Sequence, residues 1–115
     1  QELEKQNQEL LESARKAVKQ DLVNRLSEPL NHLLKRMNAE KGKLHKSALS
    51  KVRESIERAG LMNVDDDNDI KTLCKTIDDK TRELSVEAIR ESSARREEAK
   101  ETTQELLEKL SEYGA

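Results

Sequence analysis

Apolar residues recur at every third or fourth position along the first third of this chain. The series is Leu11, Ala14, Val18, Leu22, Leu26, Leu30, Leu33 and Met37. Steps of this size place side chains on one face of an α-helix, so the spacing predicts an amphipathic helix over residues 1–37. The mean step is longer than the ~3.5 residues of a left-handed coiled coil, which favours packing in a helical bundle.

Pro29 interrupts this series, because proline has no N–H to donate to the carbonyl of Arg25. Either a second helix begins at the sequence SEPL with Ser27 as its N-cap, or one helix continues through the proline with a kink. The apolar positions stay in phase on both sides of Pro29. This continuity favours the single kinked helix.

Aromatic residues are almost absent, so the core must be aliphatic and thin. The chain has no Phe and no Trp, and its one aromatic residue is Tyr113. Charged residues make up 40% of the 115 positions but nearly cancel, to a net charge of −2. Disorder combines low hydrophobicity with high net charge, so this near-neutral chain is expected to fold. We predict an all-α protein, a small helical bundle that forms a single domain or fragment over residues 1–115.

A second helix is expected after the sequence NAEKGK, where Gly42 can adopt the left-handed backbone conformation that ends a helix. It covers residues 44–59 and ends at Gly60. Ile56 and Leu61 then stand where a Schellman motif places its apolar contact.

Two more helices complete the pattern. A short one spans the apolar positions of residues 70–77. The last runs from Ser85, a suitable N-cap, to residue 113, and Leu84 and Ile89 stand at the positions of a hydrophobic staple.

The two ends of the chain carry its weakest apolar patterns. A helix must bury its apolar face against something, so we expect the long N- and C-terminal helices to pair antiparallel as a stalk. The expected partner-helix contacts join leucines from the two ends: Leu3, Leu10 and Leu11 with Leu106, Leu107 and Leu110. Small residues would also meet, with Ala14 and Ala17 against Ala99.

This pairing divides the chain into two parts. Residues 22–90 form a bundle head, and residues 1–21 and 91–113 form the helical stalk. The alternative is that the terminal faces pair with another subunit, or with a missing part of the chain, since the start at Gln1 suggests a fragment.

The segment NVDDDNDIKTL crowds four aspartates together and resembles a calcium loop at first sight. With Asp65, Asp67 and Asp69 at positions 1, 3 and 5, an EF-hand needs Gly at position 6 and Glu at position 12. Those positions hold Ile70 and Thr76. Acidic side chains also suit the exposed N–H groups at a helix start. The sequence therefore favours helix capping over a cation site.

No other set of residues indicates catalysis. His32 and His45 lie on different segments without the spacing of a zinc site. Cys74 sits in an apolar pattern and is expected to be a buried, unreactive thiol. A glycine-rich phosphate loop is missing. We therefore expect no enzyme activity, no cofactor and no small-molecule substrate.

Apolar runs are too short to suggest a membrane span or a signal peptide. One cysteine also excludes an internal disulfide. The expected location is the reducing cytoplasm.

Basic residues gather between positions 35 and 53, where Glu40 is the one acid. The cations are Lys35, Arg36, Lys41, Lys43, Lys46, Lys51 and Arg53. Such a group can bind nucleic-acid phosphates, and we take Lys35, Arg36, Lys41, Lys43 and Lys46 as the candidate contacts. The alternative is an ordinary solvated surface, because the stretch lacks aromatic side chains on which the bases of a single strand could stack.

Three stretches in order, LVNRLSEPLNHLLKRMN, LHKSALSKVRESIERAGLMN and SVEAIRESSARREEAKETTQELLEKLSEYGA, resemble the C-terminal half of a family of domains of unknown function. The shared order is a Pro-bearing amphipathic helix, a helix ending in ERAGLMN and a closing helix, over residues 18–115. That family occurs in phages, prophages and integrative or conjugative elements, often beside genes for a MoxR-like AAA ATPase and a von Willebrand A-type protein. The resemblance implies an accessory or adaptor role in a mobile-element system and supplies no catalytic residues.

The sequence thus favours a non-enzymatic helical module for protein–protein interaction or assembly, which binds a protein partner or itself. The alternative is an accessory nucleic-acid-binding module that uses the basic stretch. A small hydrolase or metal enzyme stays possible only if a missing part of the protein carries the activity.

Overall fold

The computed structural model describes residues 2–38, 44–64 and 66–114, and every element within these ranges is an α-helix. The elements in order are α1 (Glu2–Asn38), α2 (Lys46–Met62), α3 (Asn68–Arg82), α4 (Val86–Glu91) and α5 (Ser93–Gly114). The predicted all-α bundle is confirmed.

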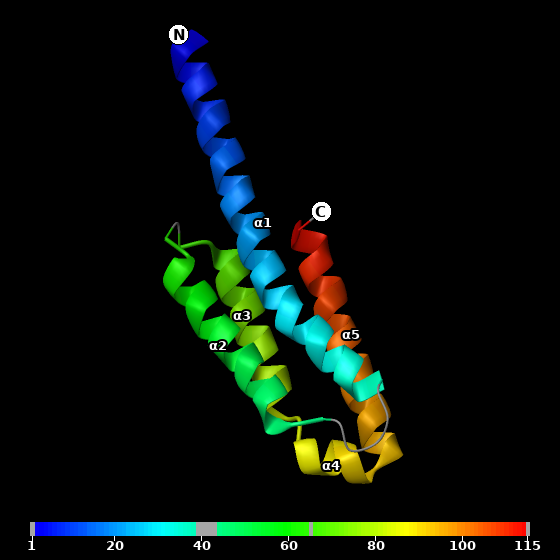
Figure 1. Ribbon diagram of the computed structural model, residues 1–115. Helices are drawn as coiled ribbons and strands as arrows, with labels where there is room; N and C mark the ends of the chain where they lie inside the picture. The colour runs from blue at the N-terminus through cyan, green and yellow to red at the C-terminus, as the bar shows by residue number, and fades with distance from the viewer. Residues whose placement is uncertain (1, 39–43, 65, 115) are drawn as a thin grey trace.

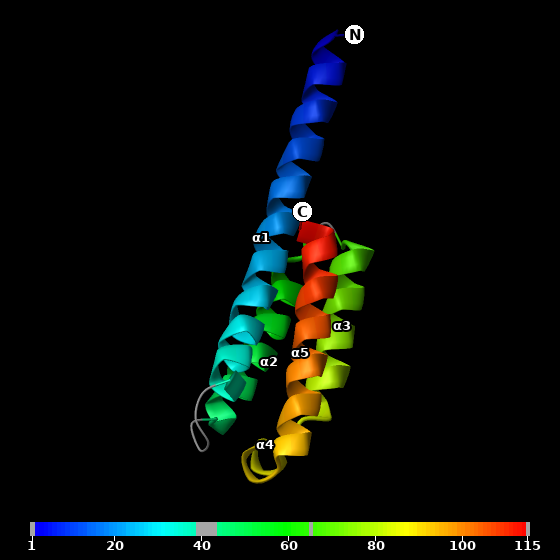
Figure 2. The same cartoon turned by 90° about the vertical axis from the view of Figure 1, so that its right-hand side faces the viewer.

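The four long helices run alternately in opposite directions (Figure 1). α1 contacts α2 and α5, while α3 contacts α2 and α5, which closes a ring of four helices. The short α4 packs against α5 at one end of the bundle, which we refer to as the α4 end (Figure 2). The opposite end, where α2 ends and α3 begins, we refer to as the Lys19 end. The terminal helices α1 and α5 pair antiparallel, as predicted.

Aliphatic side chains fill the core. α1 contributes the series Leu22, Leu26, Leu30, Leu33 and Met37, which are all buried and lie about one turn apart. These are the same positions that the apolar spacing predicts, so the inner face of α1 follows directly from its sequence.

Small and polar residues complete the core where helices approach closely. Ala99 of α5 is buried, and so are the hydroxyl-bearing Thr81 and Thr103. Each hydroxyl donates a hydrogen bond to a carbonyl one turn earlier, from Thr81 to Ile77 at 2.7 Å and from Thr103 to Ala99 at 2.8 Å. Burial therefore leaves neither group without a partner.

α1 passes through Pro29 as one helix, so the prediction of a single helix is confirmed. Ser27 is not an N-cap, because its hydroxyl donates to the carbonyl of Val23 at 2.9 Å in mid-helix. Proline in a helix interior costs about 3 kcal/mol. Burial of a leucine contributes about 1.5–3 kcal/mol, so Leu26 and Leu30 on either side together offset the cost.

α2 ends later than predicted. Gly60 lies inside the helix, which continues to Met62 with Asn63 as its C-cap. Leu61 is 84% exposed, so the predicted Schellman contact with Ile56 is wrong. The helix ends at Asn63 because this side chain bonds to the backbone of the next loop, as described below. The predicted break at Gly42 lies outside the described residues.

The last predicted helix is divided in two at Ser92. Ser85 caps α4 as predicted, its hydroxyl accepting from the N–H of Ala88 at 3.3 Å. Ser92 then adopts an extended conformation, and its hydroxyl accepts from the N–H of Arg95 at 3.3 Å. The prediction of one unbroken helix was wrong because Ser92 can cap a new helix with its own side chain.

Candidate interaction face

The leucines predicted to meet across a stalk lie in two different environments. The three from α5 belong to the bundle core, two of them buried and one half-buried: Leu106, Leu110 and Leu107. The three from α1 are 74%, 68% and 55% exposed: Leu3, Leu10 and Leu11. The predicted contacts between the two groups do not form within the chain.

The register of α5 along α1 explains this difference. Tyr113 near the end of α5 lies beside Lys19, whose ammonium is 5.7 Å from the centre of the ring. α5 thus lies along residues 22–37 of α1, where the apolar series is continuous and more surface is buried. Ala99 is consequently buried there, and not against Ala14 and Ala17, which are exposed.

Residues 2–18 of α1 extend beyond the bundle as a single helix, which we refer to as the projecting segment (Figures 1 and 2). Every residue from 3 to 18 is exposed. The segment makes the molecule long and narrow, with extents of 64 × 22 × 18 Å. No described part of the chain covers it.

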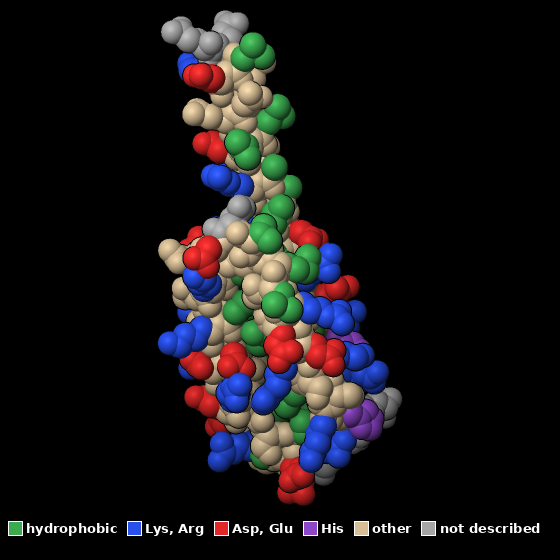
Figure 3. Space-filling view, turned by 90° about the vertical axis from the view of Figure 1, so that its left-hand side faces the viewer, with side chains coloured by type: hydrophobic (Ala, Val, Ile, Leu, Met, Phe, Trp, Pro, Cys, Tyr) green, Lys and Arg blue, Asp and Glu red, His purple; other side chains and the backbone are tan. Residues whose placement is uncertain are grey.

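One side of the projecting segment is apolar. We refer to this face as the apolar stripe: Leu3, Leu10, Leu11, Ala14, Ala17 and Val18. At about 100° per residue these side chains occupy an arc of roughly 120°, and Asn7 falls within the same arc. Figure 3 shows apolar side chains following this side of the segment down to the body of the molecule.

Apolar exposure continues onto the Lys19 end of the bundle. Leu61 and Val64, at the end of α2 and in the loop after it, are 84% and 83% exposed. A cavity of about 300 Å³ opens at the base of the projecting segment, lined in part by Val18 and Leu22 of α1 and by Val64. The apolar stripe therefore leads to a hollow of mixed lining, in which Arg15, Lys19 and Asp67 lie beside these apolar side chains.

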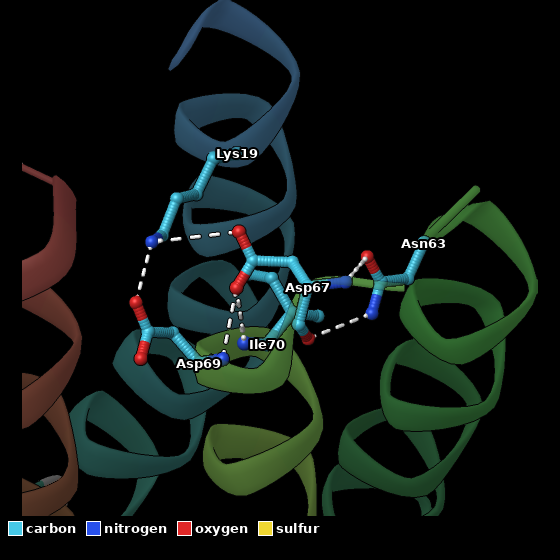
Figure 4. Close-up of polar contacts among 5 residues, drawn as sticks. All are labelled: Lys19, Asn63, Asp67, Asp69 and Ile70. Carbon is cyan, nitrogen blue, oxygen red and sulfur yellow. Dashed lines mark hydrogen bonds and ion pairs between the residues drawn. The ribbon is translucent and has the colours of Figure 1, made fainter. Parts of the chain in front are cut away.

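Lys19 fixes the base of the projecting segment to α3 (Figure 4). Its ammonium donates to the Asp69 carboxylate at 2.6 Å and lies 3.5 Å from the Asp67 carboxylate. The hydrogen bond to Asp69 is the largest of the contacts that raise the pKa of Lys19 above the ordinary lysine value. This contact ties the base of the projecting segment to the first turn of α3.

Asp67 starts α3, as the capping prediction for the aspartate cluster requires. Its carboxylate accepts from the N–H groups of Asp69 at 2.8 Å and Ile70 at 3.3 Å. Asn63 holds Asp67 in place from the end of α2, accepting from its N–H at 3.0 Å and donating to its carbonyl at 3.1 Å (Figure 4). Helix capping is therefore confirmed for Asp67, while Asp65 lies outside the described residues.

No local signal in the sequence indicates the role of Lys19. Its partner Asp69 is 50 positions away in the chain, and no local pattern links them. The capping pattern identifies the aspartates, but the packing of α1 on α3 decides which lysine reaches them.

Three of the predicted nucleic-acid contacts lie at the α4 end. Lys35 and Arg36 are exposed in the last turn of α1, and Lys46 is exposed at the start of α2. Lys41 and Lys43 lie outside the described residues. The described cations thus share one end of the bundle, and nucleic-acid binding stays a prediction.

An acid lies among these cations. Glu87 of α4 approaches Lys46, with 3.8 Å between its carboxylate oxygen and the ammonium. Arg90 donates to the carbonyl of Leu44 at 2.6 Å and holds the start of α2 against α4. Lys46 and Arg90 at this end therefore already make contacts with other groups of the chain.

Chemically reactive side chains do not gather in the described ranges. His, Cys, Asp and Glu form no group of three there that could hold a metal ion. Cys74 is buried, and burial raises the pKa of its thiol, which disfavours the nucleophilic thiolate.

Among the described residues, no helix is both long and apolar enough to cross a membrane. Comparison with known proteins finds no matching family model, no matching curated protein and no matching solved structure. The resemblance to the mobile-element family therefore stays a prediction.

Proposed function

We propose that this protein is a non-enzymatic helical assembly module, and that the apolar stripe is the surface through which it binds another helix. The observation that carries the proposal is the exposure of Leu3, Leu10 and Leu11 on one face of a helix that leaves the bundle. Each leucine gains about 1.5–3 kcal/mol when it is fully buried, so a covering helix has a strong driving force.

The physics of isolated helices supports the same proposal. A helix shorter than about 12–15 residues is marginal in water, and longer ones are usually stabilised by packing of an apolar face. The projecting segment has only weak support of this kind from its own chain, since residues 3–18 are exposed. Its helical form is best explained by a partner that covers the stripe.

The expected setting of such a module is an accessory role in a phage or other mobile-element system. This part of the proposal rests on the resemblance of residues 18–115. The partner is to be sought among proteins encoded nearby, and self-association through the proposed surface is testable with the chain alone.

Amide hydrogen exchange of residues 3–18 tests the proposed surface. In the native chain, protection of these amides is expected to rise with protein concentration, because association covers the segment. Leu10→Glu places a charge in the stripe and should remove the concentration dependence. Lys5→Gln makes the same change in net charge about 140° away around the helix and should behave as the native chain.

Exchange that is fast and independent of concentration in all three chains, and that stays fast in the native chain when proteins encoded beside it are added, would contradict the proposal. Equal, concentration-dependent protection in Leu10→Glu and the native chain would assign association to a different surface.

Nucleic-acid binding is the second candidate, favoured by the exposed Lys35, Arg36 and Lys46 at the α4 end. Binding through phosphates weakens steeply with salt and shows little sequence preference. Lys35→Glu with Lys46→Glu should therefore reduce affinity alike for unrelated duplexes at low salt. Absence of binding at low salt, or binding that is insensitive to salt, would exclude this candidate.

A further inference from the structure

We infer that the helix covering the apolar stripe is the projecting segment of a second copy of this chain, running antiparallel. The inference rests on the proposed assembly function and goes further by naming the occupant and its direction. The charges that flank the stripe, the length of the segment and the apolar surface at its base each support this pairing.

Charge changes sign along the projecting segment. Acids occupy its outer part, with Glu4, Glu9 and Glu12, and bases occupy the part nearest the bundle, with Arg15 and Lys16. Lys5 is the exception in the outer part. Like Glu9 and Glu12, it lies on the side of the helix away from the stripe. Glu4 and Arg15 are the two opposite charges that flank one edge of the stripe. An antiparallel second copy sets the acidic part of each helix beside the basic part of the other, which is self-complementary.

The edge of the stripe makes this complementarity specific. Glu4 and Arg15 are eleven positions apart, close to three full turns, so they lie on the same edge beside Leu11. In an antiparallel pair related by a two-fold axis, equal edges of the two helices meet. Glu4 of each copy then lies beside Arg15 of the other, and two equivalent ion pairs form.

Parallel pairing lacks this advantage. It brings the edge that carries Glu4 and Arg15 against the opposite edge of the stripe, which carries the uncharged Gln6 and Ser13. No opposite charges then meet, so the charge pattern favours the antiparallel direction.

The length of the segment also fits a second copy. With Leu10 of both copies at the two-fold axis, Leu3 of one comes opposite Ala17 of the other. The first turn of each helix then arrives where the other bundle begins, beside the cavity that Val18 and Val64 line. The two bundles lie at opposite ends of the pair, and each stripe is covered over its whole length.

Oxidative cross-linking of single-cysteine variants tests the direction of pairing. In the inferred dimer, the cysteine of Leu10→Cys forms a disulfide with the same cysteine of the second copy. Leu3→Cys alone does not form a disulfide. In the antiparallel pair, position 3 of one copy and position 3 of the other are separated by about 21 Å along the helix axis, which is too far for a disulfide. An equal mixture of Leu3→Cys and Ala17→Cys chains does cross-link, because these two positions of different copies lie opposite each other. The native chain, whose Cys74 is buried, is the control.

A charge exchange tests the ion pairs in the same dimer. Glu4→Arg and Arg15→Glu should each weaken dimerisation roughly fivefold, since each change replaces two attractive contacts with repulsive ones. The double variant restores both pairs and should return the dissociation constant close to that of the native chain.

Each outcome bears on a different claim. Cross-linking of Leu3→Cys alone, or a double variant no better than the two single variants, overturns the antiparallel second copy and leaves the assembly function standing. A native chain whose projecting segment shows no concentration-dependent protection overturns the second copy as the occupant, and the assembly function falls as well if no protein encoded beside this one protects the segment.

Discussion

The ammonium of Lys19 and the carboxylate of Asp69 meet at 2.6 Å, although 50 positions separate them in the chain. Lys19 is the residue at which α1 enters the bundle, and Asp69 lies in the first turn of α3. Tyr113 of α5 lies against the same ammonium, so three helices meet at this residue. The contact anchors the helix that carries the apolar stripe.

Removal of the Lys19 ammonium should destabilise the bundle modestly. The side chains of Lys19 and Asp69 are 27% and 49% exposed, so solvent weakens the ion pair. We expect Lys19→Met to lower the free energy of unfolding by about 1 kcal/mol, measured by urea denaturation. Lys16→Met, an exposed lysine on the same helix, is the control. Equal effects of the two changes would show that the contact contributes nothing.

The same contact should weaken in strong alkali. The partners of Lys19 raise its pKa in the folded protein, so its stabilisation is complete below the ordinary lysine pKa of about 10.4. It is lost as the pH rises through the folded value, where the ammonium loses its proton. The difference in unfolding free energy between the native chain and Lys19→Met should therefore shrink between about pH 9 and pH 12. A difference that stays constant or grows would contradict this assignment.

Leu110 and Leu3 should respond very differently to the same substitution. Leu110 is fully buried, so Leu110→Ala is expected to cost about 2–5 kcal/mol of unfolding free energy. Leu3 is 74% exposed, so Leu3→Ala should change the stability of the dilute chain by less than about 0.5 kcal/mol. Thermal or urea unfolding at low protein concentration measures both. Similar losses would mean that Leu3 is also packed within the chain.

Ser92 should contribute as the cap that starts α5. Ser92→Ala removes the acceptor for the N–H of Arg95 and is expected to cost about 1 kcal/mol. Ser93→Ala, the same change at the next and exposed position, should cost clearly less. Urea denaturation of the two variants compares them directly. If Ser92→Ala is as stable as Ser93→Ala, the break between α4 and α5 has another cause.

Much of the fold could be predicted from local patterns. The buried series from Leu22 to Met37 follows the 3.6-residue period of a helix, and that period survives Pro29. Ser85 and Asp67 were recognisable as helix starts because a short polar side chain before an apolar face is a local signal.

The errors arise where two local signals compete or where packing decides. Gly60 looks like a helix end, but the side chain of Asn63 bonds to the backbone of Asp67 and ends α2 three residues later. The register of α5 depends on the total apolar surface that the two helices bury along α1. No short stretch of sequence carries this information. For this reason Leu3, Leu10 and Leu11 were paired with the wrong part of the molecule.

The solution mass of the native chain, measured by light scattering over a range of protein concentrations, is the decisive experiment. If the apolar stripe is covered by a second copy, the mass rises from the 13.2 kDa of one chain towards twice that value, and Leu10→Glu stays at 13.2 kDa. A native chain that keeps the mass of one molecule at every concentration would contradict self-association through the projecting segment.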